Sequence, residues 1–394
     1  MTTESPFFLT KVECPICKTI NEFETIKVGA YTETDPDTDF CPTNRTWRNP
    51  RYQAYNPLLF FVATCSNCFY TREFNNRFKD WKNDAYFKTY RLKTVKERHL
   101  EMLARADSTI KAIGSELDID RFPNETAIMK LLLAVIDEKI SDTDNNLDLA
   151  RYYLRIAWIF RDLERGENPN VAVMKGYLSD VDSKLEGLRK NLFELEGRLT
   201  DISASISSQF DDSNIPAAVM SSLLPIRDRY NVELASFKEV LSILDAKSDG
   251  LSQIVAEHRK IALGTTGEDM IPGFHSHKSF YDFLSKLATG FEEIPHNERD
   301  ALKYSVHYYR KAFQDGRNIA KGNQQIQASY LIAELSRRIG EYQQAKEYFN
   351  TTIRTGQEFI YKHKGDPGRT ALARKILELA IEQGRLNLAE VKAG

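Results

Sequence analysis

The motifs Cys14-Pro-Ile-Cys17 and Cys65-Ser-Asn-Cys68 decide the fold of the N-terminal part of this chain. In each motif two thiols lie three residues apart, a spacing at which both sulfurs can bind one tetrahedral metal ion. Four thiolates are typical of structural zinc, so we predict that Cys14, Cys17, Cys65 and Cys68 bind Zn²⁺. A redox dithiol and an iron–sulfur site use the same residue type and stay open as alternatives.

The residues between the two motifs predict short strands and a long loop. Asn21–Val28 mixes apolar with polar residues, and Leu58–Thr64 is an apolar run that leads directly into the second motif, so we predict a strand in each. Thr32–Pro57 is rich in Pro, Asp, Asn and Thr and is predicted to be a loop. The interval from Lys18 to Thr64 exceeds the ~15–20 residues of a compact ribbon. We therefore predict a small β domain, zinc-ribbon-like, over residues 1–85.

Cys41, within Asp39-Phe-Cys-Pro42, is the fifth cysteine. An odd number of cysteines argues against a disulfide framework. Cysteine is often buried, so a small buried side chain is one interpretation of Cys41. The other is a redox thiol that exchanges with the metal site or senses oxidants.

Composition limits the class of protein. The chain has 394 residues with 42 % hydrophobic residues and a net charge of -2, which indicates two to four globular units and no overall field that attracts nucleic acid or anionic lipid. The first nine residues lack a basic segment followed by an apolar one, and no run of about 18 apolar residues occurs. We expect a cytoplasmic protein with no membrane partner, in a compartment where thiols stay reduced.

A basic and aromatic stretch follows the second cysteine motif. Between residues 69 and 98, Lys and Arg outnumber Asp and Glu, and aromatic residues are interleaved with them. Cations for phosphate and rings for base stacking are what single-stranded nucleic acid requires, and the candidates are Arg72, Arg77, Lys79 and Lys82. The alternative is a helix whose aromatic residues pack on the zinc segment while its charges face water.

Several motifs together resemble a known family. They are, in chain order, Cys14-Pro-Ile-Cys17, Asp39-Phe40, Tyr55-Asn-Pro-Leu-Leu-Phe60, Cys65-Ser-Asn-Cys-Phe-Tyr70 and Leu154-Arg-Ile-Ala-Trp-Ile-Phe-Arg161. This order is similar to the bacterial DUF-twenty-two-twenty-five family, a domain of unknown function. The resemblance implies a zinc-binding head on a tetratricopeptide-like helical body and supplies no activity. The chain departs from the family pattern at Phe69, where a glycine is common, and by an additional central segment.

Helical patterns dominate after residue 86. Ala127–Ile136 and Leu147–Arg165 predict two antiparallel helices, and we expect residues 86–176 to form a tetratricopeptide-like helical unit. Over residues 177–262, apolar residues recur at alternating spacings of three and four on both sides of Asp211–Pro216. This pattern predicts a long antiparallel coiled-coil hairpin. It would serve as a protruding docking arm, fold back as core, or associate with a second copy of the chain. The first series is Leu178, Val181, Leu185, Leu188, Leu192, Leu195, Leu199, Ile202 and Ile206, and the second is Leu223, Ile226, Tyr230, Leu234, Phe237, Leu241 and Leu244.

Residues 263–394 predict a second helical repeat domain. Residues 326–359 fit one tetratricopeptide repeat, with Ala333, Ala345 and Phe349 at the helix contact and Gly340 at the turn. A concave face of such a stack is a usual place for a peptide to bind. The candidate partner-binding residues are Tyr304, Tyr308, Gln327, Tyr330 and Arg337, although tyrosines at helical spacing also serve in packing.

The sequence predicts a mainly α protein without a complete catalytic constellation. No Ser/His/Asp or Cys/His neighbourhood is visible, and no glycine-rich phosphate loop occurs. We expect a non-enzymatic, zinc-stabilised scaffold or adaptor that binds an unidentified protein partner through the repeats, the hairpin or both. A nucleic-acid-binding protein that uses the zinc segment and residues 69–98 is the alternative.

Overall fold

A computed structural model describes residues 5–141, 145–164, 169–210, 216–263, 274–316 and 319–393. The chain divides into two compact units, one formed by Met1–Pro169 with Ile271–Gly394 and the other by Asn170–Met270. Three of the four segments expected from the sequence therefore share the first unit. The predicted fold class is confirmed at the level of a mainly helical protein with small N-terminal antiparallel sheets.

Three two-stranded antiparallel sheets form the N-terminal part. They pair β1 (Phe7–Glu13) with β2 (Ile20–Ile26), β3 (Tyr31–Pro36) with β4 (Pro42–Trp47), and β5 (Val62–Thr64) with β6 (Thr71–Glu73). Trp47 anchors the β3–β4 hairpin because its buried ring contacts Phe7 and Tyr31 and its indole donates to the carbonyl of Tyr55 at 2.9 Å. The short helical turns are η1 (Pro50–Tyr52), η2 (Pro57–Phe60), η3 (Phe74–Phe78) and η4 (Phe87–Arg91).

Two details of this region differ from the sequence-based prediction. The expected loop Thr32–Pro57 contains the β3–β4 hairpin, and that prediction was wrong because β3 has a mostly exposed face without apolar residues to reveal its period. The strand expected over Leu58–Thr64 begins only at Val62, because Asn56 caps η2 and accepts a hydrogen bond from the amide of Leu58.

Helix α3 lies at the centre of the first unit. Every residue of α3 from Leu131 to Glu138 is buried, because β5, β6 and η2 pack on one side of the helix and α4 on another. Glu138 is neutralised by Arg91, 2.6 Å away. A helix buried on all sides reads as a continuous apolar run, which is why α3 was recognisable from sequence. The helices up to this point are α1 (Leu92–Ala104), α2 (Thr109–Ser115), α3 (Pro123–Lys139) and α4 (Asn146–Glu164).

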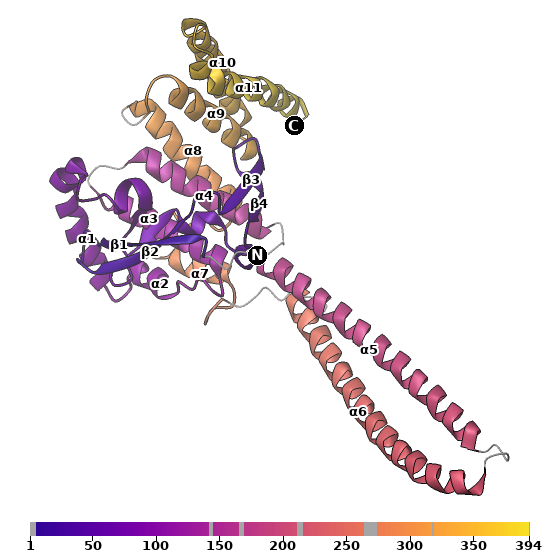
Figure 1. Cartoon of the computed structure of the whole chain (residues 1–394). Helices are drawn as coiled ribbons and strands as arrows, with labels where there is room; N and C mark the ends of the chain where they lie inside the picture. Colours follow the sequence, from indigo (N-terminus) through magenta and orange to yellow (C-terminus); the bar gives the residue numbers. More distant parts are fainter. Residues whose placement is uncertain are drawn as a thin grey trace. The chain divides into compact units, whose positions relative to one another are not determined.

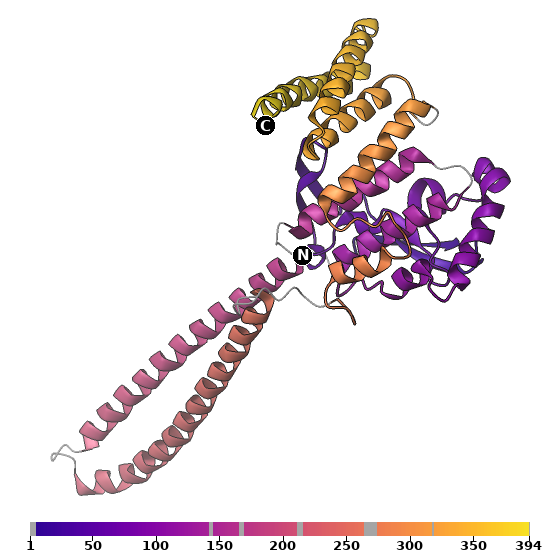
Figure 2. The ribbon, with the colours of Figure 1, turned by 180° about the vertical axis from the view of Figure 1, so that it is seen from behind.

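The C-terminal helices stack in chain order on α4. Helix α8 packs on α4, α9 on α8, α10 on α9 and α11 on α10, as both ribbon views show (Figures 1 and 2). Ala333 and Ala345 are fully buried in the same cluster as Phe349, and Gly340 turns the chain with a φ of 87°. These small residues let α9 and α10 approach closely. The bounds are α7 (Phe280–Leu287), α8 (Glu298–Asp315), α9 (Asn323–Arg338), α10 (Tyr342–Lys362) and α11 (Pro367–Ala393).

The second unit consists of two long helices, α5 (Pro169–Phe210) and α6 (Ala217–Leu263), which run antiparallel (Figure 1). Lys238 reaches Thr200 at 3.5 Å, and Arg189 forms an ion pair with Asp249, so both contacts connect the two helices. Leu185 and Leu241 of the predicted seam are buried, Leu192 and Leu199 are partly buried, and Leu188, Leu195, Ile202 and Ile226 are 38–65 % exposed. The helices are where the heptads predict them, but the apolar seam is only partly covered.

Among the described residues, no helix has both the length and the apolar character needed to cross a membrane.

Candidate metal centre

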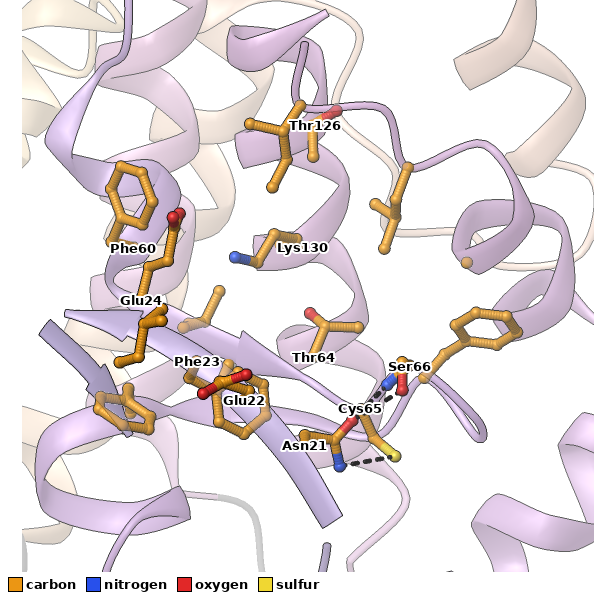
Figure 3. Close-up of a pocket in the computed structure, with 18 of the residues that line it drawn as sticks. Asn21, Glu22, Phe23, Glu24, Phe60, Thr64, Cys65, Ser66, Thr126 and Lys130 are labelled. Carbon is orange, nitrogen blue, oxygen red and sulfur yellow. Dashed lines mark hydrogen bonds between the residues drawn. The ribbon is translucent and has the colours of Figure 1, made fainter. Parts of the chain in front are cut away.

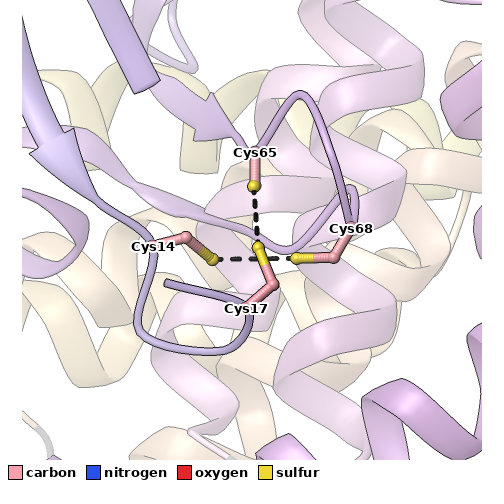
Figure 4. Close-up of side chains that lie close together, drawn as sticks. All are labelled: Cys14, Cys17, Cys65 and Cys68. Atoms are coloured by element: carbon pink, nitrogen blue, oxygen red, sulfur yellow. Dashed lines mark hydrogen bonds between the residues drawn. The ribbon is translucent and has the colours of Figure 1, made fainter. Parts of the chain in front are cut away.

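The four sulfurs of the paired motifs converge. Cys14 Sγ lies 3.7 Å from Cys68 Sγ, and Cys17 Sγ lies 3.5 Å from Cys65 Sγ. All four ligand atoms lie within 4.8 Å of one another, and their side chains point to one centre from two loops (Figure 4). A tetrahedron with metal–sulfur bonds of ~2.3 Å has sulfur–sulfur edges of about 3.8 Å. The observed spacing therefore fits one four-coordinate metal ion.

The two motifs have the same backbone conformation. The amide of Cys14 donates to the carbonyl of Thr19, and the amide of Cys65 donates to that of Tyr70, both at 2.9 Å. In each loop the residue after the second cysteine is left-handed, with a φ of 65° at Lys18 and 63° at Phe69. The side chains of these loops differ, so the shared hydrogen bonds and the spacing of the cysteines set their geometry.

The left-handed position explains why glycine suits residue 69, and a close contact explains how phenylalanine is accommodated there. A left-handed conformation costs a side-chain-bearing residue about 1–2 kcal/mol. The Phe69 ring lies flat against Gly114 of α2, where a Cβ would approach its ring carbons to 2.2 Å. Glycine at 114 therefore provides the space that the ring of Phe69 fills.

Polar groups around the sulfurs fix the ligands in place. The side-chain amide of the buried Asn21 donates to Cys65 Sγ at 3.4 Å, and its carbonyl accepts from the amide and hydroxyl of Ser66 at 2.8 and 2.9 Å. The amide of Ile16 donates to Cys14 Sγ at 3.4 Å. N–H donors toward sulfur favour the thiolate form that a metal requires.

His99 braces the second loop from α1. Its Nδ1 lies 2.6 Å from Asp137 Oδ1, and its Nε2 lies 2.8 Å from the carbonyl of Cys68. With Asp137 ionised, both partners are acceptors, and the fully buried ring then donates from both nitrogens as an imidazolium. Burial opposes this charge, but Asp137 outweighs it and raises the pKa of His99. Asp137 also accepts from the amide of Thr71 at 2.7 Å, which ties α1, α3 and the cysteine loop together.

The titration of the thiols favours a cation at the centre. The contact with Cys65 raises the pKa of Cys14, and the same contact lowers the pKa of Cys65, since one thiol shares its proton with the neighbouring thiolate. Contacts with Cys14 and Cys65 raise the pKa of Cys68. Four thiolates at this spacing repel one another, so all four lose their protons together only when a metal cation balances the charge.

Cys41 does not join the cluster. Its side chain is 2 % exposed, and Sγ lies 3.7 Å from the carbonyl of Pro42. Burial raises the pKa of Cys41 to about 12, which disfavours the thiolate that redox chemistry requires. The simple buried thiol, one of the two interpretations from sequence, describes these contacts.

The basic and aromatic stretch is largely turned inward. Phe74, Phe78, Trp81 and Phe87 are buried, all four in one cluster with residues of the cysteine loops. Arg72 is 6 % exposed with its guanidinium over the Phe87 ring. Arg77 lies 3.4 Å from Asp148, and Lys82 lies 3.1 Å from Glu13, whereas Lys79 is exposed and Tyr86 and Tyr90 are 57 % and 70 % exposed.

Most of the expected partner-binding residues hold the fold together. Tyr308 and Tyr330 are buried, so their assignment to a binding surface was wrong; Tyr308 donates to Glu293, and Tyr330 donates to the carbonyl of Thr38 at 2.7 Å. Arg337 forms ion pairs with Glu334 and Glu390. Tyr304 and Gln327 are partly exposed. Tyrosines at helical spacing pack here, as the alternative from sequence stated.

A cavity of about 650 Å³ adjoins the metal centre. Strands β2 and β5 line it, Cys65 lies at its edge, and Lys130 extends into it from α3 (Figure 3). The ammonium of Lys130 donates to the carbonyl of Leu59 at 2.6 Å, and burial lowers the pKa of Lys130 to about 8. Of the four cysteines, Cys65 alone thus belongs to the lining of this pocket.

A family model for uncharacterized proteins conserved in bacteria (DUF2225) matches residues 7–179 and 278–364. The chain belongs to this family. The resemblance drawn from the cysteine motifs is confirmed. The chain matches no curated protein and no solved structure.

The match to DUF2225 covers most of the first unit and only the start of the second. They include the four cysteines, His99, Asp137 and helices α8 to α10, while residues 180–277 lie outside the match. Most of α5 and all of α6 are therefore additions to the pattern that defines the family.

Asn21, His99 and Asp137 were not identified from sequence. His99 is one of seven histidines, and its role depends on two partners that are 31 and 38 residues distant along the chain. Asn21 is four residues from Cys17, and only the meeting of the two cysteine loops brings it to Cys65. A histidine in a helix that follows a cysteine motif was the one available signal.

Proposed function

We propose that this DUF2225 protein is a non-enzymatic scaffold or adaptor of the bacterial cytoplasm whose N-terminal part is stabilised by structural Zn²⁺. The observation that carries the proposal is the set of four sulfurs within 4.8 Å of one another, which no ligand of another kind from the described residues joins. Zinc with four cysteine ligands has no open coordination position for a substrate. Such a site stabilises a fold and activates no water.

Metal analysis of the purified protein tests the zinc assignment. We expect one zinc per chain by inductively coupled plasma mass spectrometry and no absorbance near 400 nm. Iron with that absorbance would indicate an iron–sulfur cluster instead. A disulfide between the motifs with no bound metal would overturn the structural-zinc proposal.

The partly covered seam of α5 and α6 supports a role in recognition. Of the seam residues, Ile226 is 65 % exposed, Ile202 48 % and Leu244 43 %. Large apolar side chains in such number on two long helices mark a surface that another protein covers. An apolar helical partner, or the same helices of a second copy of the chain, fits this surface.

Site-specific photo-crosslinking tests this role. A photoreactive phenylalanine at Ile226 should give discrete adducts in cells, and the same residue at Tyr361, which is 77 % exposed on α10, should not. Adducts with the chain itself would identify self-association. Absence of adducts at Ile226, or equal adducts at both positions, would contradict recognition through these helices.

Nucleic-acid binding is the second candidate, and one observation favours it. The rings of Tyr86 and Tyr90 lie 5.3 Å apart and are both exposed, and Lys79 and Lys93 of the same stretch of sequence are exposed too. Exposed rings beside cations suit base stacking. We expect no binding of labelled oligothymidylate in fluorescence anisotropy if the scaffold proposal holds; binding that is lost in Tyr86→Ala and Lys79→Glu would favour nucleic acid.

A further inference from the structure

A second cavity, of about 710 Å³, lies in the first unit between the end of β2, the β3–β4 hairpin, η2 and α4. It is separate from the cavity beside the metal centre, since Phe60 is the one lining residue that both share. Its volume is within the range of about 300–1,000 Å³ that is usual for small-molecule pockets. Neither the four cysteines nor any residue of α5 or α6 lines this cavity.

Arg155 of α4 lines this cavity without a countercharge. Its Nη1 donates to the carbonyl of Arg151 at 3.0 Å, and its guanidinium lies 4.0 Å from the centre of the Phe61 ring. Its Nε is buried and has no hydrogen-bond partner. Among the described parts of the chain, no carboxylate forms an ion pair with it.

The neighbouring arginines of α4 differ. Arg151 pairs with Glu73 and Asp148, and Arg161 pairs with Asp39 at 2.6 Å. Burial, followed by repulsion from Arg151, lowers the pKa of Arg155, whereas carboxylates raise the pKa of Arg161 despite its burial. Leaving a buried guanidinium unpaired is costly, and the cost falls on the residue that faces the cavity.

The remaining lining has an excess of positive charge and many aromatic rings. Lys27 and Arg45 add two cations and Glu33 adds one carboxylate; Arg45 pairs with Glu33 at 3.4 Å and, outside the lining, with Asp162 at 2.6 Å. The rings come from Tyr31, Phe40, Phe60, Phe61 and Trp158. Asp39 accepts the indole N–H of Trp158 at 3.1 Å, which fixes that ring at the wall.

We propose that this cavity binds a small organic molecule that combines a planar aromatic ring with an oxyanion. The oxyanion, a carboxylate, sulfonate or phosphate, binds the Arg155 guanidinium where that group lines the cavity, since a guanidinium is a charged N–H donor suited to such a group. The ring packs among the aromatic side chains. The site is independent of the proposed scaffold function and of the metal.

Two fluorescent probes that differ in one group test the proposal. 8-Anilinonaphthalene-1-sulfonate has the ring system and an oxyanion, and N-phenyl-1-naphthylamine has the same ring system without the sulfonate. We expect one sulfonate probe per native chain, bound at least about tenfold more tightly than the neutral probe, because only the sulfonate probe forms a charge-assisted hydrogen bond with Arg155. Equal affinity for both probes would overturn the proposal.

Variants locate the binding. Arg155→Gln should weaken the sulfonate probe about tenfold and leave the neutral probe unchanged. Lys130→Gln, at the other cavity, should change neither affinity. Undiminished sulfonate binding in Arg155→Gln, or its loss in Lys130→Gln, would place the probe elsewhere and overturn the assignment.

Thermal unfolding without probe separates a binding role from a structural one. Arg155→Met should raise the melting temperature, followed by circular dichroism, because it removes an unpaired buried charge and keeps the packing on Phe61. Under the proposal this more stable variant no longer binds the sulfonate probe. A lower melting temperature would show that Arg155 stabilises the apo fold, which the proposal excludes.

Discussion

The sulfur cluster and the α5–α6 pair both arise from strict spacing in the sequence, yet the structure completes one and leaves the other open. At the cluster the four sulfurs meet, Asn21 donates a hydrogen bond to Cys65 Sγ, and His99 forms one with the carbonyl of Cys68. Along α5 and α6, Leu188, Ile202 and Ile226 keep 42–65 % of their surface in water. A local motif is complete within two short loops, whereas a seven-residue repeat needs a second surface along its whole length.

Among the substitutions considered, removing one sulfur should destabilise the N-terminal segment most. Cys65→Ser leaves three thiolates, and we expect loss of the metal and of stability on the order of 10 kcal/mol, enough to unfold the N-terminal segment. Metal content and limited proteolysis measure this. Cys41→Ser is the matched control and should keep the metal. An unchanged metal content in Cys65→Ser would show that Cys65 is not needed to hold the metal.

Replacing His99 should lower the free energy of unfolding by less than the loss of a sulfur does. His99→Ala leaves Asp137 buried without its cation, so we expect a loss of about 3–5 kcal/mol in urea unfolding. His307→Ala, at an exposed histidine of α8, should change stability by less than about 0.5 kcal/mol. Similar losses in both variants would mean that His99 contributes no more than a surface residue.

Filling the space at Gly114 should cost about 2 kcal/mol, since a methyl group there overlaps the Phe69 ring. The check is a double-mutant cycle by urea unfolding. In the Phe69→Ala background, Gly114→Ala should be nearly neutral. Additive effects of the two substitutions would disprove the contact.

Lys130 gives a smaller, pH-dependent effect. Its pKa is about 8 in the folded chain against 10.5 for an unperturbed lysine, so between these values the unfolded chain holds more protons and stability rises with pH. The penalty is fully present below pH 8. Because Lys130 is partly exposed, we expect Lys130→Met to gain about 1 kcal/mol at pH 7 and nothing at pH 10.5. A gain that does not change with pH would contradict this.

Deleting α5 and α6 should have the smallest effect on the unit that holds the sulfur cluster. We would replace residues 170–270 by a short Gly-Ser linker. The remaining chain should keep its metal and its midpoint of urea unfolding. The ground is that these residues form their own compact unit and lie mostly outside the family match. Aggregation or metal loss in the shortened chain would show that α5 and α6 belong to the core.

The contrast also explains which predictions succeeded. Spacing identified Cys14, Cys17, Cys65 and Cys68, and period identified α3, α5 and α6, because each signal lies within a few helical turns. The β3–β4 hairpin was missed because β3 lacks apolar alternation. Tyr308 and Tyr330 were misassigned because a helical stripe of tyrosines does not reveal which neighbour covers it.

The sequence by itself determined the four cysteines of the candidate metal centre and the positions of the long helices, because both depend on residues that are close along the chain. Only the tertiary structure decided that His99 would face Cys68 and Asp137, that Phe69 would fill the space at Gly114, and that Arg155 Nε would have no hydrogen-bond partner among the described residues. Each of these depends on which distant segment packs against the residue, and local spacing carries no information about that neighbour.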